Sequence, residues 1–304
     1  MVVMNIRRGA VAGCLVAAVA AVSGCSEDGA GGSGAAGDSP TVLTALYPLG
    51  FVVERVGGED ISMQSLAAPG VEAHDVELSP RQVGAVANSA LVVYLDGFAP
   101  AVDEAVEQNA PDRGFDVSTV IALAPAEGSG NAASAMDPHF WLDPIRLGEL
   151  ATAIAGRLGE LDPGHAADFD GRAAALVGEL HDLDAAYEAG LTGCASTTLV
   201  TSHDAFGYLS SRYGLQPVSI AGLEPDAEPS AARISEVQDI IRATGTSTIF
   251  FEPLASSAVA DSIAADLGVR SAALDPLESP PNTGDYLTAM TANLTALRTG
   301  LRCT

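Results

Sequence analysis

The chain has 304 residues, 48% of them hydrophobic, so it is long enough to bury one large core or two moderate ones. Its 14 basic residues, all arginine, stand against 39 acidic residues and give a formal net charge of −25 at pH 7. This charge repels nucleic acid and anionic membrane surfaces, so we expect neither as a direct partner. It favours cations near the surface, and it also keeps the protein soluble.

The N-terminus is typical of a secretion signal. Arg7 and Arg8 form a short basic region, and an apolar run follows from residue 9 to residue 22. A membrane-spanning helix needs about 20 apolar residues, and this run is shorter. The sequence therefore predicts export and not a membrane span.

The apolar run ends in Val-Ser-Gly before Cys25, and small residues before a cysteine resemble a bacterial lipobox. We interpret residues 1–24 as a lipoprotein signal peptide and expect diacylation of the Cys25 thiol. An ordinary signal peptide with an incidental cysteine is the alternative, but residues 25–40 have the Gly/Ala/Ser-rich composition of a flexible tether. We expect an extracytoplasmic protein that only a lipid anchor holds to the outer face of the cytoplasmic membrane.

From Thr41 onward, short apolar runs alternate with helix signals such as Ser79-Pro80, an N-cap followed by proline at the first helical position. This alternation predicts α/β layers with parallel sheets. The expected strands are 41–45, 61–66, 91–95, 197–201, 218–220, 249–252 and 271–274. The expected helices among them are 48–55, 80–87, 204–213, 230–243, 256–267 and 285–299.

The middle of the chain breaks this alternation with two long helical patterns. One begins at Asp143-Pro144, and the other covers residues 168–191, has an apolar stripe and lacks proline. Its 24 residues would span about 36 Å. We therefore expect two α/β lobes with parallel sheets joined by one long rigid helix. The expected parts are an N-terminal lobe at 41–165, a backbone helix at 166–193 and a C-terminal lobe at 194–304.

Two cysteines, Cys194 and Cys303, follow Cys25 in the chain. An even number of cysteines in an exported protein suggests pairing, so the sequence predicts one disulfide between them.

Three of the five histidines are candidate ligands. His74 lies just beyond a predicted strand, His203 lies where a strand gives way to a helix, and His139 lies in the segment from Asp137 to Pro144. Ligands of open α/β sheets bind beyond the carboxyl ends of the strands, so two facing lobes would bring such residues together. Three imidazoles with an acidic residue suit a borderline metal such as zinc. The sequence predicts a metal site in the cleft between the lobes. A single histidine near a loop is more often a surface or capping residue, and we interpret His165 and His181 in that way.

Six motifs, in this order, resemble the metal-specific solute-binding proteins of ABC importers, the zinc and manganese receptors with a helical backbone. The resemblance implies one divalent metal ion bound between the lobes, no catalytic activity, delivery to an ABC transporter permease, and a monomer. The motifs are Ala73-His74-Asp75, Asp137 to Pro144, Thr201 to Phe206, Pro225 to Ser230, Ile249 to Glu252 and Leu274 to Glu278.

The resemblance also implies a ligand set. His74 and His139 would come from the first lobe and His203 from the second, where histidine in place of glutamate favours zinc over manganese. Either Asp275 or Glu278 would be the fourth ligand, and the sequence does not choose between them.

Acidic neighbours of these histidines have two interpretations. Asp75, Asp204 and Glu252 would orient imidazoles or tune the charge of the site, or each would be a helix cap or a surface acid. Many zinc receptors have a long histidine-rich capture loop before the second ligand. Here the corresponding segment, residues 124–136, is short and contains no histidine, so such a loop is absent there.

Two other functions compete with the receptor. A secreted zinc hydrolase would keep three histidines and a water on the metal, with Glu252 or Glu278 as general base. No His-Glu-x-x-His motif supports it. A surface adhesin, a role attributed to some relatives, is the third hypothesis.

Overall fold

The computed structural model describes residues 39–67, 73, 74, 76–126, 136–225, 227–254 and 256–304. All of the described residues belong to one compact unit, Asp38–Thr304. The predicted signal peptide, the predicted lipidation site Cys25, nearly all of the predicted tether and Asp75 lie outside the described residues.

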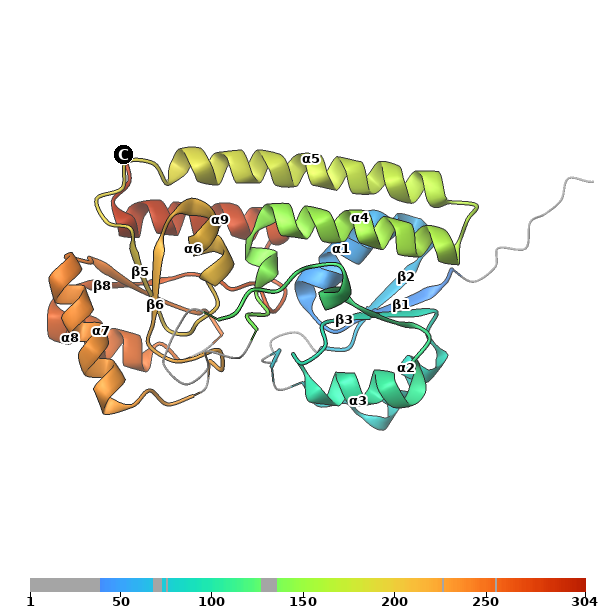
Figure 1. Cartoon of the computed structure of the whole chain (residues 1–304), viewed down its shortest axis with the longest axis horizontal. Helices are drawn as coiled ribbons and strands as arrows, with labels where there is room; N and C mark the ends of the chain where they lie inside the picture. The colour runs from blue at the N-terminus through green and yellow to red at the C-terminus, as the bar shows by residue number, and fades with distance from the viewer. Residues whose placement is uncertain (1–38, 68–72, 75, 127–135, 226, 255) are drawn as a thin grey trace, which may run out of the picture. The chain divides into compact units, whose positions relative to one another are not determined.

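This unit contains two lobes, each built on a four-stranded parallel sheet (Figure 1). The first sheet has the order β2-β1-β3-β4 and the second the order β6-β5-β7-β8. Each of these strand pairs is parallel, as the alternating pattern predicts. The strands are β1 Thr41–Thr44, β2 Ser62–Ser65, β3 Leu91–Tyr94, β4 Gly114–Asp116, β5 Thr198–Thr201, β6 Gln216–Ser219, β7 Thr248–Phe251 and β8 Arg270–Ala273.

Helices pack on both lobes, and several begin with side-chain caps, among them the expected cap at Ser79. Ser79 and Gln82 form a capping box, and Asp143 and Asp285 each accept a backbone N–H of the first helical turn. The helices are α1 Tyr47–Gly57, α2 Pro80–Asn88, α3 Pro100–Asn109, α4 Pro144–Leu161, α5 Ala166–Gly190, α6 Gly207–Tyr213, α7 Ala231–Thr244, α8 Ala258–Leu267 and α9 Tyr286–Leu301. Three short 3₁₀ turns are η1 Gly58–Asp60, η2 Val117–Thr119 and η3 Phe140–Leu142.

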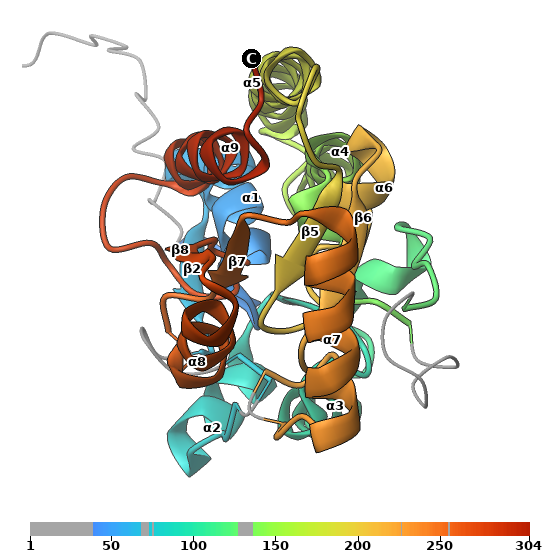
Figure 2. The ribbon, with the colours of Figure 1, turned by 90° about the vertical axis from the view of Figure 1, so that its left-hand side faces the viewer.

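The long helix α5 runs along both lobes, with α4 beneath one end and α9 beneath the other (Figures 1 and 2). It packs on α1, α4 and α9. Phe169, Leu176 and Leu180 are buried on its inner face, and the Tyr187 hydroxyl donates to the Met290 carbonyl at 2.6 Å. These contacts fix α5 to helices of both lobes, so the sequence-based expectation of two lobes joined by a long helix is confirmed.

The main hydrophobic core does not stop at the border between the lobes. One cluster of buried side chains extends from Val42 in β1, through Leu176 in α5, to Leu199 in β5 and Leu297 in α9. A smaller second cluster lies within the C-terminal lobe and includes Val237 and Ile263 from α7 and α8. A continuous, close-packed core resists relative movement of the lobes.

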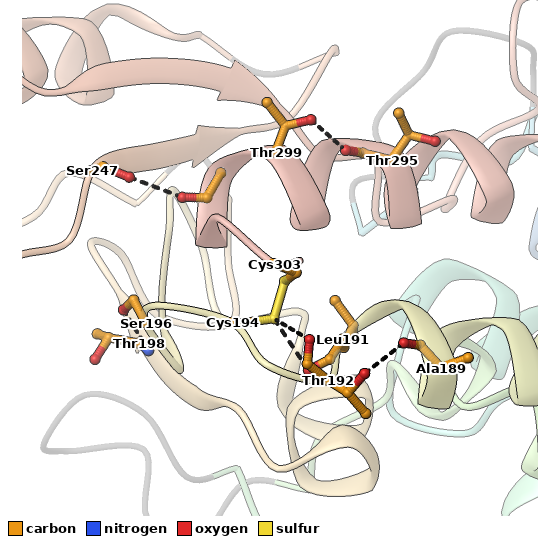
Figure 3. The surroundings of a disulfide bond; sticks show 11 residues. Ala189, Leu191, Thr192, Cys194, Ser196, Thr198, Ser247, Thr295, Thr299 and Cys303 are labelled. Carbon is orange, nitrogen blue, oxygen red and sulfur yellow. Dashed lines mark hydrogen bonds between the residues drawn. A yellow bond between two sulfur atoms is a disulfide. The ribbon is translucent and has the colours of Figure 1, made fainter.

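A disulfide joins Cys194 and Cys303 in the structure. Figure 3 shows it linking the loop after α5 to the end of α9. The Cys194 sulfur also lies 3.1 Å from the Leu191 carbonyl oxygen. The bond ties the C-terminal end of the chain to the start of the C-terminal lobe.

Among the described residues, no helix combines the length and apolar character that crossing a membrane requires.

Candidate metal centre

Three imidazoles and one carboxylate meet between the lobes. His74, His139, His203 and Glu278 each offer one ligand atom, and these four atoms lie within 4.8 Å of one another. His203 is two residues beyond β5, and Glu278 lies in the loop after β8. The side chains come from segments far apart in the sequence, and the fold brings them together at the carboxyl ends of the strands.

The distances fit a small tetrahedral ion. Oε1 of Glu278 lies 3.0 Å from Nε2 of His139 and 3.6 Å from Nε2 of both His74 and His203. An ion with four ligands at the zinc distances of 2.0–2.2 Å places those ligand atoms roughly 3.4 Å apart. Nε2 of His203 is buried and has no hydrogen-bond partner among the described residues. The donor set and its spacing therefore fit zinc.

Two buried carboxylates orient two of the imidazoles. Nδ1 of His139 donates to Oδ1 of Asp137 at 2.8 Å, and the backbone N–H of His139 donates to the same oxygen at 2.9 Å. Nδ1 of His203 makes a short hydrogen bond with Glu252, whose Oε1 also accepts the Ser202 hydroxyl at 2.9 Å. Because each Nδ1 is held in this way, Nε2 is left to face the cluster.

Glu252 was among the residues expected to orient an imidazole, whereas Asp137 was not. Asp137 belongs to the motif that carries His139, and the signal available in the sequence was its position two residues before that histidine. The intervening Pro138 favours a turn in which the carboxylate folds back onto the following backbone N–H.

Residues of the second lobe hold Asp137 in place. The Tyr208 hydroxyl donates to the Asp137 carbonyl at 3.0 Å and accepts the Ala124 N–H at 2.7 Å. A Cβ at Gly207 would lie 2.6 Å from Oδ2 of Asp137, so glycine is needed for this close approach. The loop of His139 is therefore fixed from both lobes.

The electrostatics of the cluster reflect its burial and its acids. Burial disfavours a charged His139, but its bonds to Asp137 and Glu278 outweigh this and raise its pKa to about 9. Burial likewise disfavours a charged His203, but its hydrogen bond to Glu252 and the nearby carboxylate of Glu278 outweigh this and raise its pKa to about 10. Burial would raise the pKa of Glu278, yet its three histidine neighbours hold it well below its ordinary value. Without a metal ion, protons on the imidazoles balance the negative charge of the site.

Of the two candidates for the fourth ligand, the structure brings Glu278 and not Asp275 to the imidazoles. Oδ1 of Asp275 accepts the N–H of Leu277 at 2.8 Å. Asp275 also lines, with Asn293, a separate cavity of about 260 Å³ whose lining includes none of the four cluster residues.

The remaining candidate residues lie elsewhere. Asp204 is buried next to His203, and its N–H donates to the Gly222 carbonyl. His165 is half exposed at the start of α5 and bonds Asp162, and His181 is exposed on α5. Neither of these two histidines belongs to the cluster among the described residues.

A cavity of about 580 Å³ opens beside the cluster. His74 is the cluster residue that lines it, and the His74 ring stacks on Phe98 with 4.3 Å between the ring centroids. Its other walls come from both lobes, including Asp96 from the first and Glu224 from the second. The cavity and the cluster therefore meet at His74.

The structure thus has two parallel-sheet lobes on a helical backbone, with a three-histidine, one-carboxylate cluster between them. Comparison with known proteins gives the family. The family described as "Zinc-uptake complex component A periplasmic" matches residues 42–300, and the chain belongs to it. The resemblance expected from the sequence is confirmed.

Two relatives illustrate the similarity. The zinc-binding lipoprotein AdcA of Streptococcus pneumoniae is 31% identical over 274 residues, which cover 84% of this chain and 55% of AdcA. The chain thus spans about half the length of that relative. The high-affinity zinc uptake system protein ZnuA of Bacillus subtilis is 29% identical over 301 residues, covering 92% of this chain and 93% of ZnuA.

Solved structures agree with the fold. The laminin-binding adhesin Lmb of Streptococcus agalactiae has a TM-score of 0.79 at 31% identity, covering 86% of this chain and 99% of that one. The Zn(II)-bound ZnuA-like domain of Streptococcus pneumoniae AdcA has a TM-score of 0.74 at 31% identity, with the same coverage.

Proposed function

We propose that this protein binds one Zn²⁺ ion outside the cytoplasmic membrane through His74, His139, His203 and Glu278, and passes it to an ABC import permease. The convergence of four ligand atoms within 4.8 Å carries this proposal. Membership of a zinc-uptake family supports the permease as partner, because an extracytoplasmic receptor needs a membrane protein to move its cargo inward.

The chemistry of the site favours zinc over manganese. Three imidazole nitrogens and one carboxylate oxygen form a donor set that zinc binds in tetrahedral geometry. Manganese prefers more oxygen-rich sites with six ligands, and the described residues of the cluster supply four.

The same ligand count disfavours a hydrolase. A catalytic zinc keeps a position open for water, and four protein ligands would fill a tetrahedral ion. The adhesin hypothesis has support in the name of the similar Lmb structure. Metal binding has the more direct support, because it follows from residues of this chain.

The membrane anchor and the monomeric state are parts of the same proposal. The lipobox-like residues before Cys25 support a diacylated N-terminus, and the similar AdcA is named a lipoprotein. The lipid would keep the receptor near its permease, and residues 25–40 would act as the tether.

Competitive titration of the metal-free chain, residues 26–304, with zinc and with manganese tests the proposal. A chelator of known affinity sets the scale, and elemental analysis after dialysis gives the stoichiometry. We expect one zinc ion per chain and at least tenfold tighter binding of zinc than of manganese. Equal affinities, or no retained zinc, would contradict the proposal.

A further inference from the structure

The turn that carries Glu278 has an unusual backbone. Leu277, the residue before Glu278, has a φ of 59° and a fully buried side chain. The left-handed conformation is unfavourable for leucine, because its Cβ crowds the following carbonyl oxygen. Such a conformation persists only where neighbouring groups hold it. The contacts around this turn therefore decide where the Glu278 carboxylate lies.

Asp275 makes the first of these contacts. Its Oδ1 accepts the backbone N–H of Leu277 at 2.8 Å. A carboxylate that accepts the N–H two residues later closes an Asx turn and fixes the direction of the chain. Asp275 thus acts on the residue that immediately precedes Glu278.

Asn293 holds Asp275 from α9. Its Oδ1 accepts the N–H of Asp275 at 3.0 Å, and its Nδ2 donates to the Asp275 carbonyl at 2.7 Å. Asn293 is only 4% exposed, so the loss of either bond would leave a buried polar group without its partner. The paired amide fixes the start of the turn relative to a rigid helix.

Trp141 holds the other side of the turn from the first lobe. Its Nε1 donates to the Pro276 carbonyl at 2.8 Å, and its ring centroid lies 5.3 Å from that of His139. The turn of Glu278 is therefore connected to the segment that presents His139.

We propose that Asp275 and Asn293 are positioning residues for the Glu278 carboxylate, and that Asp275 acts through the backbone of Leu277 instead of contacting the metal. This inference rests on the proposed function, because it assigns a task within the proposed zinc site. A carboxylate held in advance at tetrahedral spacing favours a small four-coordinate ion over a larger one that accepts six ligands. Loosening the turn should therefore reduce zinc affinity more than manganese affinity.

The test compares two substitutions at Asp275 in residues 26–304. Asp275→Asn keeps an oxygen that can accept the Leu277 N–H, whereas Asp275→Ala removes it. We expect Asp275→Ala to weaken zinc binding about 10–100-fold, the range typical of groups that support metal ligands, and to lower the ratio of zinc to manganese affinity. The zinc affinity of Asp275→Asn should stay within about threefold of that of the unchanged chain, because the asparagine oxygen can still accept the Leu277 N–H and hold the turn.

Asp285→Ala is the matched control. Asp285 caps α9, the helix that carries Asn293, by accepting the Thr288 N–H at 3.0 Å. Its replacement makes the same chemical change as Asp275→Ala without touching the turn. It should lower the melting temperature and leave zinc affinity unchanged. Asn293→Ala should reproduce the loss of Asp275→Ala, and the double variant should lose no more than either single one, because both act on the same turn.

Several outcomes would overturn the inference. If Asp275→Asn binds zinc as weakly as Asp275→Ala, the carboxylate acts as a ligand or through its charge. If Asp275→Ala binds zinc with unchanged affinity, Asp275 has no positioning role. If Asp275→Ala does not fold, Asn293→Ala decides in the same way. The proposed function has its own test: the unchanged chain binds zinc, and Glu278→Gln weakens that binding. If both results are obtained, the proposed function stands even when the Asp275 variants contradict the positioning role. If the unchanged chain does not bind zinc, the proposed function itself fails.

Discussion

Zinc binding should expel protons from the cluster. The raised pKa values of His139, about 9, and His203, about 10, mean that both imidazoles are protonated at pH 7 in the metal-free protein. A metal ion needs their neutral form. Glu278, whose pKa is lowered, is already ionised and releases nothing. We therefore expect about two protons released per zinc ion bound at pH 7.

The pH dependence follows with a definite sign. With two protons displaced, zinc affinity should rise about 100-fold from pH 7 to pH 8, and the rise should slow above pH 9 as His139 loses its proton. The same raised pKa values stabilise the metal-free fold. That contribution is complete below the unfolded histidine pKa of about 6.5 and is lost as the pH rises through 9 and 10.

Isothermal titration calorimetry in buffers of different ionisation enthalpy counts the released protons. Asp137→Asn should reduce the count from about two toward one, because it removes the negative charge beside Nδ1 that stabilises the protonated imidazole of His139 and raises its pKa. His165→Ala should leave it unchanged, because His165 lies outside the cluster. Release of less than about half a proton at pH 7 would refute this reasoning.

Three further predictions address the site, the disulfide and the motion of the lobes. His139→Ala and His203→Ala should each weaken zinc binding at least tenfold, about 1.4 kcal/mol, in the competitive titration, whereas His181→Ala should not. The Cys194–Cys303 bond should stabilise the fold by at most about 4–5 kcal/mol in the chain-entropy model, and two free thiols titrated in protein exported under oxidising conditions would rule it out. Small-angle scattering should show a change of less than about 1 Å on zinc binding, against a radius of gyration of about 19 Å, because the lobes share a core and a helix; a larger decrease would exclude the rigid account.

The sequence predicted the central elements well because their environment leaves a simple pattern. Strands buried on both faces, such as β1 and β3, read as apolar runs. The edge strand β4 and the helix α3 before it were not predicted. β4 has three half-buried residues and α3 has no side-chain cap, so neither gives a strong local signal. Tertiary contacts decide such elements.

His74 and His203 could be predicted because each follows a strand, where an open sheet binds its ligands. His139 directly precedes η3, and the motif Asp137 to Pro144 singled it out. The sequence could not predict which of Asp275 and Glu278 lies at the imidazoles. That placement depends on a left-handed backbone at Leu277, and leucine does not signal this conformation. The role of Asp137 depended on a turn around Pro138 and on close contact with Gly207, which pattern reasoning does not reveal.

The ligands come from both lobes, so a bound zinc ion would act as a removable cross-link. Anything that binds only the folded chain stabilises it, by about 4 kcal/mol when the free ligand is at 1,000 times its dissociation constant. Because both lobes share the ion, this stabilisation would reach the whole unit and not one lobe. Proteases act on transiently opened chains, so the survival of this protein in the presence of proteases would follow the zinc supply.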